Sequence, residues 1–177
     1  MATLITGIVF SAVLSAYIFL GRALTRQGNE EQLESQGRVA IYWFTQDVST
    51  ATTVDPNYMT ATSLGLYLPD STDEVFYNYS AVNGTLTRTT SGAAPGPASL
   101  VLMTKLSSLA FNYYNFVPDP AASAPPVPPA AGVKQVNMAF ALVSGLAVSG
   151  AQATLVVTSP RVTLKNKVLL GGSPGLP

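Results

Sequence analysis

The 177-residue chain contains no cysteine and no histidine. Without cysteine there is no disulfide, no Cys-ligated zinc site and no thiol nucleophile. Without histidine the chain lacks the usual general base near neutral pH and the commonest metal ligand of proteins. These two absences exclude much of the ordinary chemistry of enzymes and metalloproteins.

Charge is also scarce. Asp, Glu, Lys and Arg make up 10% of the residues, and nine basic side chains balance nine acidic ones. A balanced charge gives no field that would hold nucleic acid, so we expect no nucleic-acid partner. Proteins with little net charge tend to associate near neutral pH, which suits a chain that packs against copies of itself.

The first 21 residues carry no side chain that is charged at neutral pH, and the first charge along the chain is Arg22. A helix of about 20 apolar residues is long enough to cross the hydrocarbon core of a bilayer. A cleaved signal peptide would open with basic residues, which are missing here. We therefore expect residues 1–22 to form an apolar helix that lies in a membrane, as a plain anchor, or in the core of a filament. The side chains expected to form this surface are Leu4, Ile5, Ile8, Val9, Phe10, Val13, Leu14, Ile18, Phe19 and Leu20.

Residues 23–54 read as an amphipathic continuation of the same helix. Apolar residues recur there every three or four positions, which indicates one buried stripe. The charged residues, Asp47 included, are expected mainly off that stripe. No proline occurs before Pro56, where we expect the helix to have ended. The residues predicted to pack against the rest of the chain are Leu33, Ile41, Phe44 and Val48.

Residues 55–170 change to short alternating runs, typical of antiparallel strands. Asn83-Gly84 is the strongest hairpin signal in the chain. The predicted fold is α+β, with a long N-terminal helix as a stalk packed against a C-terminal antiparallel sheet. A Pro-rich loop is expected at 117–132 and a flexible tail at 171–177. Strands are expected near 64–68, 75–79, 85–89, 109–116, 133–143, 153–158 and 161–168.

We predict no catalytic, metal or cofactor site, and therefore no enzyme. Asp70 to Glu74 holds three carboxylates in five residues, but a polar turn is favoured over a calcium loop because no glycine-bearing loop pattern accompanies them. The sequences at Asn78 and Asn83 match the N-glycosylation pattern. Such short matches are common by chance. The aromatic residues around Trp43 and Tyr113 favour core or subunit contacts rather than an electron-carrying stack.

Two segments resemble one known family. The apolar helix that begins with Thr3-Leu4-Ile5 looks like the start of a mature pilin, and residues 32–48, QLESQGRVAIYWFTQDV, resemble the family's pattern on the exposed half of that helix. A tyrosine-rich strand before residues 84–88 and the run 161–166 follow in the same order. The chain thus resembles the type IV pilin and pseudopilin superfamily, and within it the PilW/GspJ-type minor pilins.

The resemblance implies a structural subunit of an extracellular type IV pilus-like filament on a bacterial surface, held in the inner membrane before assembly. Its partners would be copies of itself, other pilins and the assembly machinery. A minor or tip subunit that primes pilus or type II secretion assembly remains an alternative, as does a monomeric membrane-anchored binding domain. The family's leader is absent, which suggests a mature, methylated N-terminus at Met1. The family's glutamate at the fifth position is replaced by Ile5, or by Thr6 in a shifted register.

Overall fold

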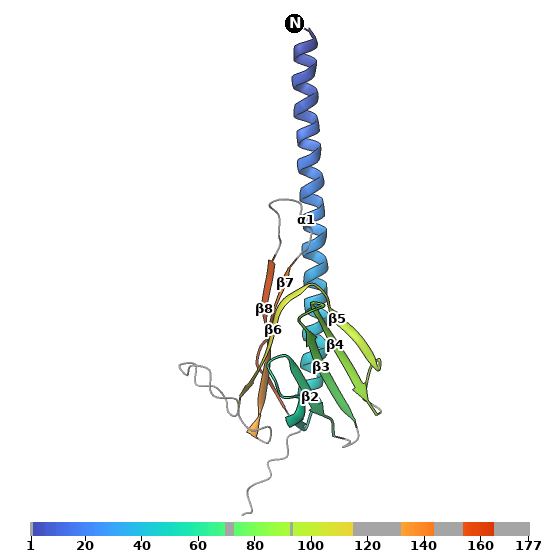
Figure 1. Ribbon diagram of the computed structural model, residues 1–177, viewed down its shortest axis with the longest axis vertical. Coiled ribbons are helices and arrows are strands. Elements are labelled where there is room, and N and C mark those ends of the chain that lie inside the picture. The colour runs from blue at the N-terminus through green and yellow to red at the C-terminus, as the bar shows by residue number, and fades with distance from the viewer. Residues whose placement is uncertain (1, 70–72, 93, 115–131, 144–153, 165–177) are drawn as a thin grey trace, which may run out of the picture.

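A computed structural model describes residues 2–69, 73–92, 94–114, 132–143 and 154–164; for residues 2–6, 8 and 9 it describes the backbone alone. A single helix, α1, dominates the molecule and spans Ala2–Thr50. Its 49 residues extend over about 74 Å at 1.5 Å per residue. The C-terminal half lies against the β-strands, and the N-terminal half projects away from them (Figure 1).

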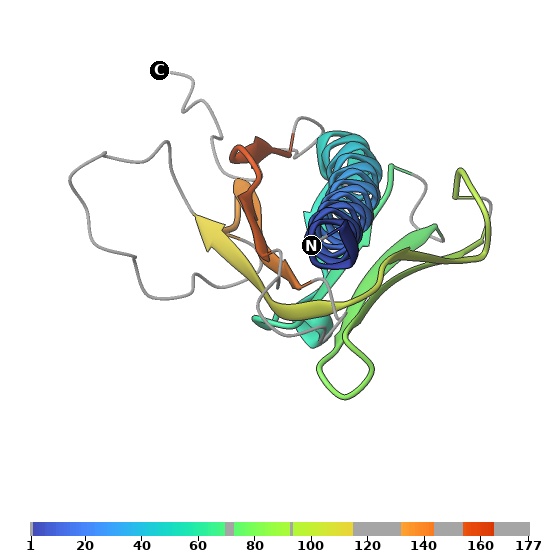
Figure 2. The ribbon, with the colours of Figure 1, turned by 90° about the horizontal axis from the view of Figure 1, so that it is seen from above.

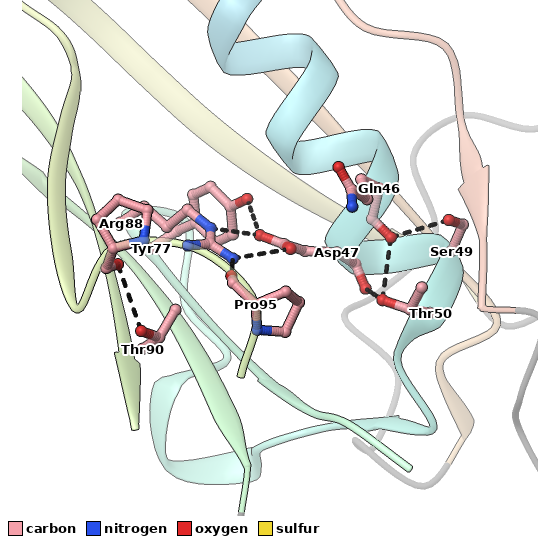
Figure 3. Close-up of polar contacts among 9 residues, drawn as sticks. Gln46, Asp47, Ser49, Thr50, Tyr77, Arg88, Thr90 and Pro95 are labelled. Carbon is pink, nitrogen blue, oxygen red and sulfur yellow. Dashed lines mark hydrogen bonds and ion pairs between the residues drawn. The ribbon is translucent and has the colours of Figure 1, made fainter. Parts of the chain in front are cut away.

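The helix was predicted to run to residue 54 but ends four residues earlier, at Thr50. The hydroxyls of Ser49 and Thr50 donate to the carbonyl of Gln46 at 2.9 and 3.0 Å, which supplies partners near the helix end (Figure 3). The chain then turns into a strand, because Thr52 donates its amide to Tyr67 at 2.9 Å. β-branched residues favour this extended conformation.

The first sheet has five antiparallel strands in sequence order. β3 and β4 pair as a hairpin across the turn that contains Gly84. Gly84 has a φ of 59°, a conformation that this type of turn requires and that glycine adopts readily. A short 3-10 helix, η1 (Pro56–Tyr58), follows the first strand and is capped by Asp55. The strands are β1 (Thr53–Val54), β2 (Ser63–Tyr67), β3 (Glu74–Ser80), β4 (Thr85–Ser91) and β5 (Ser99–Met103).

Within the described part of the chain, the second sheet has four strands. β6 and β7 pair along most of their length, and β8 and β9 both pair with β7. Tyr113 of β6 reaches the other sheet, where its hydroxyl lies 2.9 and 2.8 Å from the carbonyl oxygens of Thr60 and Ser63. The strands are β6 (Leu106–Tyr114), β7 (Gln135–Val143), β8 (Thr154–Thr158) and β9 (Val162–Thr163).

The α+β layout with antiparallel strands is confirmed, but the prediction of one sheet is wrong. The two sheets diverge from one another and α1 lies between them, seen from its N-terminal end in Figure 2. Residues 104–105 connect the two sheets, and Lys105 adopts a φ of 61° there. Among the described residues, the strands after Met103 pair with each other and none pairs with β5, so two sheets rather than one cover the helix.

The core forms where the C-terminal half of α1 meets both sheets. Leu33, Phe44 and Val48 of the helix are buried in this core, and Ile41 is partly buried against it. Phe44 stacks on Phe111 of β6 with ring centroids 6.2 Å apart. The helix therefore contributes its apolar stripe to a core that both sheets complete.

Some sequence predictions fall partly or wholly outside the described residues. The tail at 171–177 and almost all of the Pro-rich loop at 117–132 do so, as does the end of the strand expected at 161–168. A membrane-spanning segment was expected over residues 1–22. Across the part of the chain that the structure describes, no helix combines the length and the apolar character that a membrane crossing requires.

Candidate functional site

The N-terminal half of α1 exposes large apolar side chains that the rest of the chain does not cover. Tyr17 and Phe19 are 76% and 72% exposed. Residues 17 to 20 are consecutive and all large and apolar, and successive helix residues point about 100° apart. The exposed surface therefore surrounds the helix instead of forming one stripe. The exposed large apolar residues here are Phe10, Val13, Leu14, Tyr17, Ile18, Phe19, Leu20 and Leu24.

This surface contains six of the ten residues predicted to form a filament core or membrane contact. The side chains of the other four, Leu4, Ile5, Ile8 and Val9, lie outside the described residues, although their backbone continues the helix. Tyr17 and Leu24 were not among the predicted residues, and they extend the same surface. Single exposed apolar side chains are normal on proteins, but a contiguous apolar surface marks a contact with another molecule or with lipid.

A buried ion pair fixes the other half of the helix to the first sheet. Arg88 of β4 donates to the Asp47 carboxylate through Nε at 2.7 Å and Nη2 at 3.0 Å (Figure 3). Tyr77 of β3 donates its hydroxyl to the same carboxylate at 2.5 Å. All three residues are 0–1% exposed. Such charge-assisted bonds are stronger than neutral ones, and the bidentate form also fixes orientation.

Three further residues, Trp43, Pro95 and Gly96, lie close to the guanidinium of Arg88. It lies 4.6 Å from the ring centroid of Trp43, in a cation–π arrangement. Nη2 also donates to the carbonyl of Pro95 at 2.9 Å (Figure 3). The backbone of Gly96 lies close against the guanidinium, since a Cβ at this position would lie 3.0 Å from Nη1. Nη1 itself has no hydrogen-bond partner among the described residues. The helix, β3, β4 and the loop after β4 thus meet at one cation.

The surroundings of Tyr77 and Arg88 shift the pKa values of both side chains. Burial, followed by the negative charge and hydrogen bond of Asp47, raises the pKa of Tyr77 well above its usual value. Burial works to lower the pKa of Arg88, but its hydrogen bonds and attraction to Asp47 outweigh this and raise it. Arg88 therefore stays charged and Tyr77 stays protonated over the physiological range. Asp47, Tyr77 and Arg88 therefore form a structural clamp that joins the helix to the first sheet.

Asp47 was expected mainly off the apolar stripe, and that expectation is wrong: it is 1% exposed. It lies three residues after Phe44, so it occupies the same face of the helix. The alternation along β4 did indicate that Arg88 faces the core. Leu86 faces the core, and residue Arg88, two positions on, must face the same way. The pairing with Asp47 spans 41 residues, and no local pattern reveals it.

The remaining candidate sites do not gain support as catalytic or metal centres. Within the described residues, no group of His, Cys, Asp and Glu is arranged to hold a metal ion. Asp73 is buried and Glu74 begins β3, while residues 70–72 fall outside the description. Both sequon asparagines, Asn78 and Asn83, are exposed. A shallow pocket of about 350 Å³ lies over β3 and β4 beside Tyr58, with uncharged residues around it.

No known family model matches the chain, and a search of curated proteins finds no similar sequence.

Proposed function

We propose that this protein is a structural subunit of an extracellular type IV pilus-like filament, in which copies polymerise through the N-terminal half of α1. One observation carries the proposal. A 49-residue helix buries one stripe of its C-terminal half in its own domain and exposes large apolar side chains all around its N-terminal half. A surface of that shape is satisfied by several parallel neighbours of the same kind.

Burial of these apolar side chains against neighbouring helices favours a bundle. Covering one large apolar side chain contributes roughly 1.5–3 kcal/mol, and Phe10, Leu14 and Phe19 are each at least half exposed in the single chain. The clamp supports this role because it joins the stalk rigidly to the domain that would form the filament surface. Asp47 and Arg88 supply that joint through two short hydrogen bonds. The pilin-like residues 3–5 and 32–48 add the family resemblance.

A minor or tip subunit is the second candidate. The same polymerising helix serves a subunit that occurs only at a filament end, and the resemblance to PilW/GspJ-type members favours this position. The number of copies per filament separates the two. A monomeric membrane-anchored binding domain would use the helix without polymer formation.

The test replaces apolar residues of the exposed half by charged ones. Phe10→Asp and Leu14→Lys should each abolish filaments, because a charge in an apolar bundle is costly to bury. Val82→Asp is the matched control: Val82 is 96% exposed in the β3–β4 turn and does not belong to the exposed apolar surface of α1. Normal filament yield from Phe10→Asp or Leu14→Lys would contradict the proposal.

A further inference from the structure

The shallow pocket over β3 and β4 combines aromatic and uncharged polar side chains on one face of the first sheet. Side chains alternate between the two faces along a strand, and Tyr77 is buried in the core that α1 shares with the sheets. Phe76 and Asn78 therefore project from the opposite face, away from α1. Phe76 pairs with Thr89 across the hairpin. The next pair on this face joins Asn78 and Thr87.

Tyr58 of η1 supplies a second aromatic ring to the pocket. Its centroid lies 4.7 Å from that of Phe76, and the two ring planes are inclined by 57°. Gly65 of β2 pairs with Phe76 and makes this approach possible. A Cβ at Gly65 would lie 3.0 Å from the Cβ of Tyr58 and 2.9 Å from that of Asp55, too close for a side chain at this position. The glycine therefore lets η1 lie against the sheet and bring the two rings together.

The polar part of the pocket offers an amide and several hydroxyl groups. Asn78 supplies the amide, and the hydroxyls come from Ser80, Thr87 and Thr89. Within the described residues, the side chains of Asn78, Thr87 and Thr89 have no hydrogen-bond partner in the chain. An amide and a hydroxyl can each donate and accept, so these groups are available to a bound molecule.

The charge around the pocket restricts the class of ligand. A bound phosphate or carboxylate is usually held by Arg or Lys, and calcium or magnesium by carboxylates. None of the residues that line the pocket carries either kind of group. Glu74 lies on the same face, two residues before Phe76, and its carboxylate would repel an anion. The chemistry of the pocket therefore favours an uncharged ligand that has both an apolar face and several hydroxyls.

We propose that this pocket binds one neutral sugar ring in its pyranose form. The C–H bonds on one face of a pyranose carry partial positive charge, which suits the negative faces of the Tyr58 and Phe76 rings. The hydroxyls at the edge of the sugar match the amide of Asn78 and the hydroxyls of Thr87 and Thr89. The volume of about 350 Å³ is at the small end of ligand pockets, which span roughly 300–1,000 Å³. It therefore suits one ring rather than an extended chain.

The sugar site goes beyond the proposed filament function and does not depend on it. A single copy of the chain contains every residue of the pocket, so binding requires no polymer. In the proposed filament the sheets lie on the outside, and the pocket would repeat once in each copy. Many weak sites on one filament then bind a surface that carries many sugars far more tightly than one site does, because each further contact is intramolecular.

Saturation-transfer NMR of the full chain tests the binding directly. The chain is kept in a detergent that has no sugar headgroup, since such a headgroup would compete for the pocket. The probes are the methyl β-glycosides of galactose, glucose, mannose and N-acetylglucosamine. We expect saturation transfer to at least one of these glycosides. Cyclohexanol, a ring of similar size with a single hydroxyl, should receive far less.

Two variants locate the bound sugar. Tyr58→Ala removes one aromatic face and should weaken binding at least about tenfold. Thr87→Val keeps the shape of the side chain and loses the hydroxyl, so it should weaken binding about threefold to tenfold, the contribution of one hydrogen bond. Tyr42→Ala and Thr158→Val are the matched controls. Tyr42 is 64% exposed on α1, Thr158 is exposed on β8, and neither lines the pocket, so both variants should bind like the original chain.

Three results would overturn the inference. The first is transfer to none of the four glycosides, and the second is equal transfer to cyclohexanol, which would indicate a general apolar surface. The third is unchanged binding in both Tyr58→Ala and Thr87→Val, because the sugar would then lie elsewhere on the chain. Circular dichroism of each variant separates lost binding from lost folding. Valine is favoured in strands, so Thr87→Val keeps the test decisive even if Tyr58→Ala does not fold.

Discussion

Arg88 and Asp47 form a bidentate ion pair, with nitrogen–oxygen distances of 2.7 and 3.0 Å, in a place that solvent does not reach. One partner lies on the helix and the other on β4, so the ion pair holds the stalk to its domain. Removing either partner leaves a buried charge without compensation, which costs far more than removing both.

We therefore expect Asp47→Leu and Arg88→Met each to lower the free energy of unfolding by about 3–5 kcal/mol. The double variant should lose less than the sum of the two, because it leaves no unpaired charge. Urea unfolding of the full chain, followed by the fluorescence of Trp43, the single tryptophan, measures all four states. Additive losses would show that the two side chains act independently.

Tyr77 predicts a loss of stability at alkaline pH. Burial and Asp47 raise its folded-state pKa above the usual value, so the folded chain keeps a proton that the unfolded chain releases. The stabilisation is complete below about pH 10 and falls as the pH rises toward the folded-state pKa, by about 1.4 kcal/mol per pH unit for one proton. Tyr77→Phe should remove that slope, and Tyr113→Phe should act similarly because burial also raises the pKa of Tyr113.

Urea unfolding at several pH values from about 10 to 12 measures these slopes. Tyr77→Phe should also cost about 1.5–3 kcal/mol at neutral pH, through its lost hydrogen bond to a carboxylate. An alkaline slope in Tyr77→Phe identical to that of the original chain would refute the assignment of the released proton.

Two glycines should respond to alanine with opposite signs. Gly96 has a φ of 103°, and a Cβ there would meet Arg88 Nη1 at 3.0 Å and Trp43 at 3.2 Å. Gly96→Ala should therefore destabilise the chain by about 1–3 kcal/mol. Gly28 lies within α1 with open space around it, so Gly28→Ala should stabilise the helix by up to about 1 kcal/mol. Thermal unfolding of both variants gives the comparison, and equal shifts of the same sign would contradict it.

Two phenylalanines of α1 should separate folding from assembly. Phe44 is 0% exposed and Phe19 is 72% exposed. Phe44→Ala should cost about 3–5 kcal/mol of folding stability through the cavity it leaves. Phe19→Ser should leave folding unchanged and reduce filament yield. Circular dichroism and filament yield, measured on both variants, test this; a folding loss in Phe19→Ser equal to that in Phe44→Ala would refute the division of the helix.

Much of the fold follows from local patterns. The absence of proline before Pro56 and the spacing of Leu33, Phe44 and Val48 predicted the long helix, and Asn83-Gly84 predicted the β3–β4 hairpin. These features depend on periods of 3.6 and 2 residues and on turn chemistry, all of which are local.

The remaining features depend on contacts distant in sequence. The chain passes from the first sheet to the second at Lys105, whose positive φ no pattern at that position predicts. β5 was missed because Ser99–Met103 is short and follows a run of Gly and Pro. The burial of Asp47 depends on Arg88 of β4, 41 residues further along the chain, so the sequence alone placed this acidic residue on the outside by its type.

The most direct test of the central claim is cryo-electron microscopy of filaments sheared from producing cells. The proposal predicts that this chain repeats along the filament and that Phe10 to Leu24 lie in a central bundle of parallel helices, with the two sheets on the outside. Filaments built from another chain, with this one absent or confined to an end, would contradict its role as the repeating structural subunit.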